Sequence, residues 1–270
     1  MASEVRYRKD LFKGTAEYYD RFRPPYPPAL LDDLRSRVPL GGTARLLDLA
    51  CGTGQITFAL VADVGEVWAV DQEAESVRFG NAKANRLGVT NIHWLAASAE
   101  HVPLDGVFDL IAIGNAFHRL DRDAVTRRLV PHLARGGAVA LLWGGTPWRG
   151  ERRWQRALSD CLERWEREVG ALDRVPPGWE QAMDEDPHEQ VLRRAGLAYE
   201  GSFGFSVVER WSIESLIGFV YSTSFLNRAA LGDGADAFER DLRGQLLACR
   251  PDGIFEQQLT FAYELARRPD

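Results

Sequence analysis

Short apolar segments alternate with helix-like segments through the first half of the chain. The strand-like segments are 44–50, 66–71, 91–97, 107–114 and 138–144, and the helix-like segments between them are 54–63, 74–88 and 121–137. Strands that alternate with helices at this spacing predict βαβ units and a parallel sheet. Because the strand-like segments are almost continuously apolar, we expect helices on both faces of the sheet. The pattern therefore predicts an α/β fold with a doubly wound, Rossmann-like sheet.

The pattern changes after residue 145. Helix-like segments follow at 149–170, 188–196, 212–225 and 235–250, and strand-like segments at 199–211 and 255–268. We expect one domain over 1–270, with a ligand-binding core at 40–145. A helical cap over the substrate is predicted at 1–39 and 146–235, and the last helix and strand at 236–270. With an antiparallel last strand, the mostly parallel sheet would have seven strands.

The composition excludes several classes of function. The chain has 270 residues and a net charge of −6, so it has no overall positive field to hold nucleic acid or an anionic membrane. Its three cysteines are far apart and lack metal-ligand spacing, as in reduced cytoplasmic proteins. There is no signal-peptide pattern and no apolar run near the roughly 20 residues of a membrane span. We therefore expect a cytoplasmic protein without a metal site.

The segment "LLDLACGTGQITFAL" at 46–60 joins a strand to a helix through two glycines. Gly52 and Gly54 let the backbone approach a ligand closely, and the first helical turn offers free N–H groups. A dinucleotide site needs a third glycine, but position 57 is threonine. Asp48 would also repel a pyrophosphate and attract an ammonium group. The turn therefore favours a cationic ligand without phosphates.

Asp71 ends the second strand-like segment, 17 residues after Gly54. A carboxylate there can accept hydrogen bonds from both hydroxyls of a ribose. A ligand with a ribose, a cationic amino-acid end and no phosphate is S-adenosylmethionine (SAM). A nicotinamide dinucleotide remains the alternative ligand, against which the missing glycine and Asp48 count.

The chain resembles the class I SAM-dependent methyltransferases. The motifs "LLDLACGTG", "VWAVD", "WLAASAEHVPL", "FDLIAIGNAFHRLD" and "LARGGAVALLW" occur in the order and spacing of that family, over about residues 12–145. The opening "FKGTAEYYDRFRPPYP" resembles the family's small-molecule branch, in which this segment folds over the cofactor.

The resemblance implies a role for each matching residue. Asp48, Gly52, Gly54 and the backbone of Ala50 would hold the methionine part, and Asp71 the ribose. Gln72, Ser98 and Ala99 would lie at the adenine, although the family often has an aspartate where Ser98 stands. The predicted cofactor-binding residues are Tyr19, Asp48, Ala50, Gly52, Gly54, Asp71, Gln72, Ser98, Ala99 and Asn115.

The acceptor side is less well determined by the sequence. His118 either takes a proton from the acceptor or hydrogen-bonds within a loop. Tyr19 either positions the methyl group or packs a helix. Arg23 is either a surface or helix-end charge or a ligand for a substrate anion. Arg119 and Leu120 replace an aromatic pair common in the branch. The predicted substrate pocket comprises Tyr18, Phe117, His118, Trp148, Tyr221 and Phe225.

These features predict a methyltransferase that moves the methyl group of SAM to oxygen, nitrogen or carbon of a small organic acceptor by direct displacement. S-adenosylhomocysteine (SAH) would be the product. We expect a monomer or homodimer that binds no nucleic acid and no membrane. The alternatives are a SAM-binding protein without transferase activity, a NAD-dependent oxidoreductase and an RNA methyltransferase.

Overall fold

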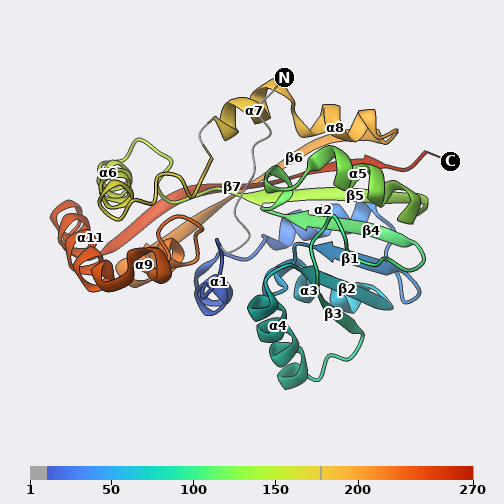
Figure 1. Ribbon diagram of the computed structural model, residues 1–270, viewed down its shortest axis with the longest axis horizontal. Coiled ribbons are helices and arrows are strands. Elements are labelled where there is room, and N and C mark those ends of the chain that lie inside the picture. The colour runs from blue at the N-terminus through green and yellow to red at the C-terminus, as the bar shows by residue number, and fades with distance from the viewer. Residues whose placement is uncertain (1–10, 177, 270) are drawn as a thin grey trace.

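The computed structural model describes residues 11–176 and 178–269 and contains one seven-stranded sheet with helices on both faces (Figure 1). The strands are β1 (Arg45–Leu49), β2 (Glu66–Asp71), β3 (Ile92–Ala96), β4 (Phe108–Gly114), β5 (Leu133–Gly144), β6 (Ala198–Ser212) and β7 (Ile254–Arg267). Their order is β3-β2-β1-β4-β5-β7-β6. Neighbours among β1–β5 pair in parallel, and β7 is antiparallel to both β5 and β6. The predicted mostly parallel sheet with an antiparallel last strand is confirmed.

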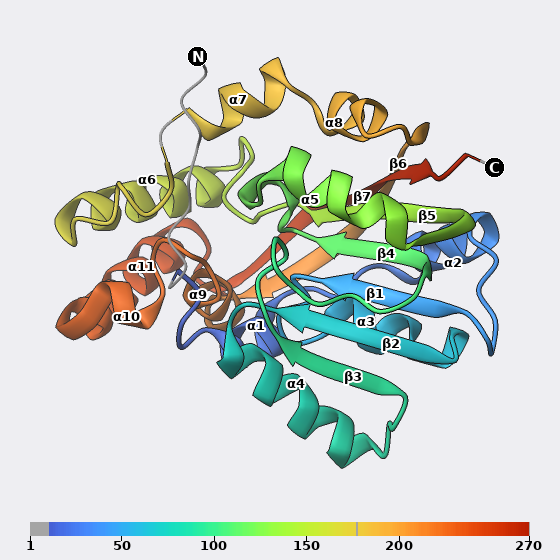
Figure 2. The ribbon, with the colours of Figure 1, turned by 45° about the vertical axis from the view of Figure 1, so that its right-hand side comes forward.

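The helices lie on the two faces of the sheet and in a cap beyond the ends of its central strands (Figure 2). They are α1 (Ala16–Phe22), α2 (Pro28–Arg37), α3 (Gln55–Leu60), α4 (Ala74–Leu87), α5 (Arg122–Leu129), α6 (Arg153–Glu168), α7 (Trp179–Glu185), α8 (His188–Arg194), α9 (Ile213–Tyr221), α10 (Arg228–Leu231) and α11 (Ala235–Cys249). Leu46 of β1 belongs to the core that α2 and α3 cover, and Leu47 to the core that α5 and α8 cover. Successive strand residues point to opposite faces, so a continuously apolar strand supplies both cores.

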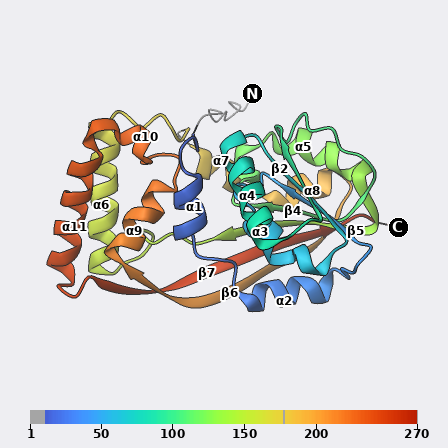
Figure 3. The same cartoon turned by 90° about the horizontal axis from the view of Figure 1, so that it is seen from below.

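The strands β6 and β7 extend beyond the rest of the sheet. β5 pairs with β7 from Phe261 to Arg267, whereas β6 pairs along all of β7. Figure 3 shows the remaining half of this ribbon running beneath α6, α9 and α11. There the ring of Phe255 on β7 lies 5.1 Å from Trp154 of α6, and Trp211 on β6 lies 5.5 Å from Phe219 of α9. The cap is therefore built on strands of the core sheet.

The second half of the chain is not one continuous helical cap. The range 146–235 includes the sheet strand β6, at the strand-like segment 199–211, and the helix α8, which packs on β6 and α5. His188 begins α8 at the start of the helix-like segment 188–196, and its ring lies 5.1 Å from that of Phe117. Contacts with β6 and α5, distant in sequence, order this region.

Helix α1 joins the core to the cap. On the core side, Asp20 accepts a hydrogen bond of 2.6 Å from Lys83 of α4. On the cap side, the ring of Phe22 lies so close to α9 that a Cβ atom at Gly218 would be 2.3 Å from it. This separation leaves no room for a side chain, so Gly218 sets how closely α1 and α9 approach each other.

Gly218→Ala should lower the free energy of unfolding by about 1–3 kcal/mol, because the added methyl group overpacks the contact with Phe22. Gly244 is the matched control, since it lies within α11 and a Cβ atom there would meet nothing within 4 Å. Gly244→Ala should raise the free energy of unfolding by about 0.5–1 kcal/mol through helix propensity. Urea denaturation measures both, and equal effects of the two substitutions would refute the close α1–α9 contact.

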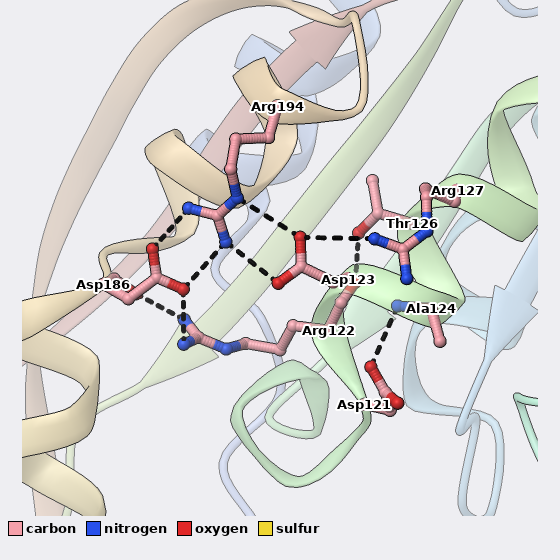
Figure 4. A network of polar contacts seen from close by, with 8 residues as sticks. All are labelled: Asp121, Arg122, Asp123, Ala124, Thr126, Arg127, Asp186 and Arg194. Carbon is pink, nitrogen blue, oxygen red and sulfur yellow. Dashed lines mark hydrogen bonds and ion pairs between the residues drawn. The ribbon is translucent and has the colours of Figure 1, made fainter. Parts of the chain in front are cut away.

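An ionic network attaches α8 to α5 (Figure 4). Arg194 of α8 donates to both oxygens of Asp186, at 2.6 and 2.9 Å, and also to Asp123 of α5 at 2.9 Å. Arg122 of α5 donates to the Asp186 carboxylate at 3.1 Å. Hydrogen bonding from Arg194 is the main cause that lowers the pKa of Asp186, and the charge of Arg122 adds to it. Two arginines from different helices thus share one carboxylate.

Asp186→Asn should lower the free energy of unfolding by about 1 kcal/mol at pH 7, a modest value because the carboxylate is partly exposed. The folded-state pKa lies below the ordinary aspartate value of about 4, so the stabilisation is present above that value and is lost as the pH falls through the folded-state pKa. Denaturation of wild type and variant at pH 7 and near pH 3 measures the loss. A difference of the same size at both pH values would contradict the ionic origin.

Candidate functional site

The strand order reverses between β1 and β4. In such sheets the loops that leave these two strands diverge and open a crevice at their carboxyl ends. The loop after β1 is the glycine turn of residues 50–54, and the loop after β4 begins at Asn115. The glycine turn and Asn115 therefore lie at the ends of neighbouring strands, at the point where the strand order reverses.

Backbone strain is concentrated at this crevice. Ala50 has a φ angle of 57° and Asn115 one of 52°, and among the described residues they are the two non-glycine residues with positive φ. Such conformations cost about 1–3 kcal/mol each and cluster at ligand-binding sites. Gly52 also has positive φ, and a Cβ atom there would meet nothing within 4 Å. At Gly54, a Cβ atom would lie 2.7 Å from the Trp94 ring, so close packing also requires glycine.

Asp48 is a buried carboxylate with one oxygen left open. It is 1% exposed, and its Oδ2 accepts hydrogen bonds from the N–H and the hydroxyl of Thr57, at 2.9 and 2.7 Å. Its Oδ1 is buried and has no hydrogen-bond donor among the described residues. Burial raises the pKa of Asp48 to about 7, and the charge of Asp71 contributes. Thr57 therefore holds the carboxylate in place. In the sequence analysis this position counted only as the one where a dinucleotide motif would have its third glycine.

Asp71 stands across the turn from Asp48. One of its oxygens accepts a hydrogen bond from the N–H of Gly52 and the other from the N–H of Glu73, both at 2.8 Å. These bonds fix the side-chain orientation while each oxygen retains a second lone pair. Burial raises the pKa of Asp71. The carboxylate is thus oriented at the end of β2, where a ribose was predicted.

The residues predicted at the adenine lie beyond β2 and β3. Gln72 is exposed, and Ala99 is 6% exposed. The hydroxyl of Ser98 lies 3.0 Å from Nδ1 of His101, so it is already engaged within its own loop. Their contacts with an adenine ring stay predictions.

Tyr26 is a residue of the crevice that the sequence interpretation missed. The side-chain nitrogen of Asn115 donates a hydrogen bond of 3.2 Å to the hydroxyl of Tyr26. The side-chain oxygen of Asn115 accepts one of 3.2 Å from the N–H of Gly144. Tyr26 is 6% exposed, and burial, with a contribution from the charge of Asp48, raises its pKa. Tyr26 lies in the segment "FKGTAEYYDRFRPPYP", which the resemblance assigns to the cofactor only as a whole.

The surroundings of His118 weaken its basicity. Nε of Arg119 donates to its Nε2 at 3.1 Å, and the ring of Trp179 lies 5.2 Å away. Burial, followed by the charge of Arg119, lowers the pKa of His118 to about 3. A neutral imidazole whose Nε2 lone pair is engaged is a poor proton acceptor. Its role as a base stays a prediction that requires Arg119 to move.

The predicted substrate-pocket residues fall into separate clusters. The half-buried ring of Trp148 lies 5.5 Å from both Phe219 and Phe225. The ring of Tyr18 lies 5.2 Å from that of Tyr221. The latter is buried, with its hydroxyl 2.7 Å from Glu239 of α11.

Phe117 is 3% exposed and packs against His188. Trp148 and Phe225 are thus more accessible to an acceptor than Phe117 or Tyr221. The lining of the pocket by these residues stays a prediction.

Residues 46–137 match the family model described as "Methyltransferase domain". This range includes the glycine turn, Asp71 and Asn115. It is a class I methyltransferase domain. Among the described residues of the whole chain, no helix combines the length and apolar character needed to cross a membrane, and no three His, Cys, Asp or Glu side chains are grouped as metal ligands.

Relatives and solved structures agree with this domain. An uncharacterized methyltransferase of Mycobacterium tuberculosis (strain H37Rv), Rv3342, is 32% identical over 166 residues, which are 58% of this chain and 62% of the relative. The chain thus spans about three fifths of the length of that relative. The YcgJ protein of Bacillus subtilis has a TM-score of 0.54 at 17% identity, over 90% of this chain and 99% of its own. The [4+2]-cyclase SpnF has a TM-score of 0.56 at 17% identity, over 98% and 97%. These two likenesses confirm the fold.

Asp48→Asn should stabilise the free protein at pH 8 by about 1–3 kcal/mol, because it removes a buried charge with an unsatisfied oxygen. The folded-state pKa is raised from about 4 to about 7. The unfolded chain therefore releases its proton first, and wild-type stability falls as the pH rises through that window. Urea denaturation at pH 5 and pH 8 measures the effect, with exposed Asp233→Asn as the control. A penalty for Asp48→Asn of equal size at both pH values would contradict this account.

Proposed function

We propose that this protein is a SAM-dependent methyltransferase that transfers a methyl group to oxygen, nitrogen or carbon of a small organic acceptor by direct displacement. The observation that carries the proposal is the open Oδ1 of Asp48, a buried acceptor with no described donor beside the strained glycine turn. A buried carboxylate oxygen of this kind suits an ammonium group, which supplies both the charge and the donor that it lacks.

The donors and acceptors of the crevice fit such a cofactor. Asp48 would bind the ammonium group, Asp71 would accept from the ribose hydroxyls, and the open surface at Gly52 would lie against the amino-acid part. A dinucleotide fits less well, because its pyrophosphate would meet the Asp48 carboxylate that Thr57 holds at the turn. The site therefore favours the sulfonium cofactor over nicotinamide dinucleotides.

When bound, SAM supplies an electrophilic methyl group on a positively charged sulfur. The residues of the chain have to bind both reactants, align them and exclude water. Alignment can lower a barrier by roughly 7–11 kcal/mol in favourable cases. Helix α1, held between α4 and α9, carries Tyr19, whose aromatic ring would lie against the sulfonium cation. No step of this mechanism needs a metal ion.

A small acceptor suits the cap better than a polymer. The net charge of −6 gives no overall positive field to attract RNA. The half-buried rings of Trp148 and Phe225 offer apolar contact to a small organic molecule. SpnF, named a cyclase, shares the fold, so the fold alone does not separate a transferase from a SAM-binding protein without transferase activity. Formation of a methylated product separates them.

Asp71→Ala should weaken SAH binding at least about tenfold, because the ribose loses a charged acceptor. Asp71→Asn keeps one acceptor oxygen and should lose less affinity for SAH. The exposed Asp233→Ala should bind SAH as tightly as wild type. Calorimetry measures the three affinities, and circular dichroism checks the fold. Unchanged affinity in Asp71→Ala would remove this residue from the site. Mass spectrometry of small-molecule extracts incubated with the enzyme and methyl-labelled SAM then tests transfer and identifies the acceptor.

A further inference from the structure

The strand β6 forms one edge of the sheet. It is the last strand in the sheet order, and it pairs with β7 along its whole length (Figure 3). No strand among the described residues pairs with its other side. Helix α2 covers one face of β6, where the guanidinium carbon of Arg37 lies 3.7 Å from the centroid of the Phe203 ring. A row of backbone N–H and C=O groups is therefore open to a further strand.

The middle of this edge lacks the features that usually keep edge strands apart. Natural edges are protected by charged side chains, proline or bulges. Residues 201–208, "GSFGFSVV", contain no charge and no proline, and the register shift of β6 lies before them, between Tyr199 and Gly201. Val208 is 75% exposed, more than any other large apolar side chain of the described residues. The edge is thus suited to pairing with another strand.

The charges at the two ends of this stretch are complementary about Phe205. In an antiparallel pair of two β6 strands with a two-fold axis at Phe205, residues equally far before and after it lie opposite each other. Glu200 and Arg210 then face each other twice, and both are exposed. No carboxylate of the described residues pairs with Arg210. Glu200 accepts from Arg267 at 2.6 Å, and a carboxylate can accept further hydrogen bonds.

The apolar side chains of β6 favour the same axis. Phe203, Phe205 and Val207 lie on the half-buried face of the strand. With the axis at Phe205, Phe203 lies opposite Val207 of the second copy, and the two Phe205 rings lie opposite each other. An axis one residue later would set Glu209 against Phe203, and an axis two residues later would set it against Phe205. An axis one residue earlier would leave no opposite charges facing each other.

We propose that two copies of this chain form a dimer through β6, antiparallel and with the two-fold axis at Phe205, so that their sheets become continuous. Phe205 pairs with Phe261, the first residue of β7 that also pairs with β5. Beyond this point the ribbon under the cap consists of β6 and β7 alone. In the dimer this two-stranded half lies along the core half of the other β6, which gives each cap ribbon a third strand.

Disulfide trapping tests the register. Gly204 and Ser206 would lie opposite each other across the axis, and a Cβ atom at Gly204 would meet nothing within 4 Å. Opposite residues of an antiparallel pair have a Cα separation that a disulfide can bridge. After mild oxidation, Gly204→Cys/Ser206→Cys should run as a covalent dimer on a denaturing gel. Each single variant should run as a monomer, and wild type, with its half-buried Cys249, is the control for other disulfides.

Charge reversal tests the ion pairs. Sedimentation velocity should show wild type as a dimer at micromolar concentration. Arg210→Glu sets carboxylates opposite each other twice and should raise the dissociation constant of the dimer at least about tenfold. Adding Glu200→Arg to Arg210→Glu restores opposite charges and should recover most of the affinity. The exposed Arg86→Glu on α4 makes the same change in charge and should dimerise as wild type does.

A wild type that stays monomeric would overturn the inference, and so would a dimer that Arg210→Glu leaves unchanged. A missing covalent dimer in the double cysteine variant, or a full one in Gly204→Cys alone, would contradict the axis at Phe205. Circular dichroism checks the fold of each variant, and the disulfide test keeps both charges as they are. None of these measurements uses SAM, so they are independent of the proposed function.

Discussion

The buried carboxylate of Asp48 is the interaction on which the crevice depends. Thr57 satisfies one of its oxygens twice, and this pair of bonds holds the first turn of α3 against the end of β1. The other oxygen lacks a described donor. Since a buried, half-satisfied charge is costly, the free protein carries a penalty that a cationic ligand would relieve. The strained backbone at Ala50 and Asn115 adds to the same penalty, so stability is given up where a ligand would bind.

The arrangement of the cap follows from the length of two strands. β6 and β7 leave the core together and carry α6, α9 and α11 on their far half (Figure 3). Helix α1 then closes the distance between this cap and the core, through Asp20 on one side and Phe22 on the other. A cap that shares strands with the core is therefore joined to it at its base, and α1 adds a second connection between the two.

The features that could be predicted from the sequence depend on neighbours along the chain. The alternation of apolar segments was enough to predict the sheet, because the periodicity of a strand or a helix is visible in a short stretch of sequence. The glycine turn and Asp71 were enough to predict where the site lies, because the carboxyl ends of neighbouring parallel strands lie side by side. The contacts of Arg23 with Ser222 and Phe219 join residues about 200 positions apart in the chain, and no local pattern reports them. For Thr57 and His118 a signal existed: a hydroxyl in the first helical turn after Asp48, and an arginine directly after the histidine that competes for its lone pair.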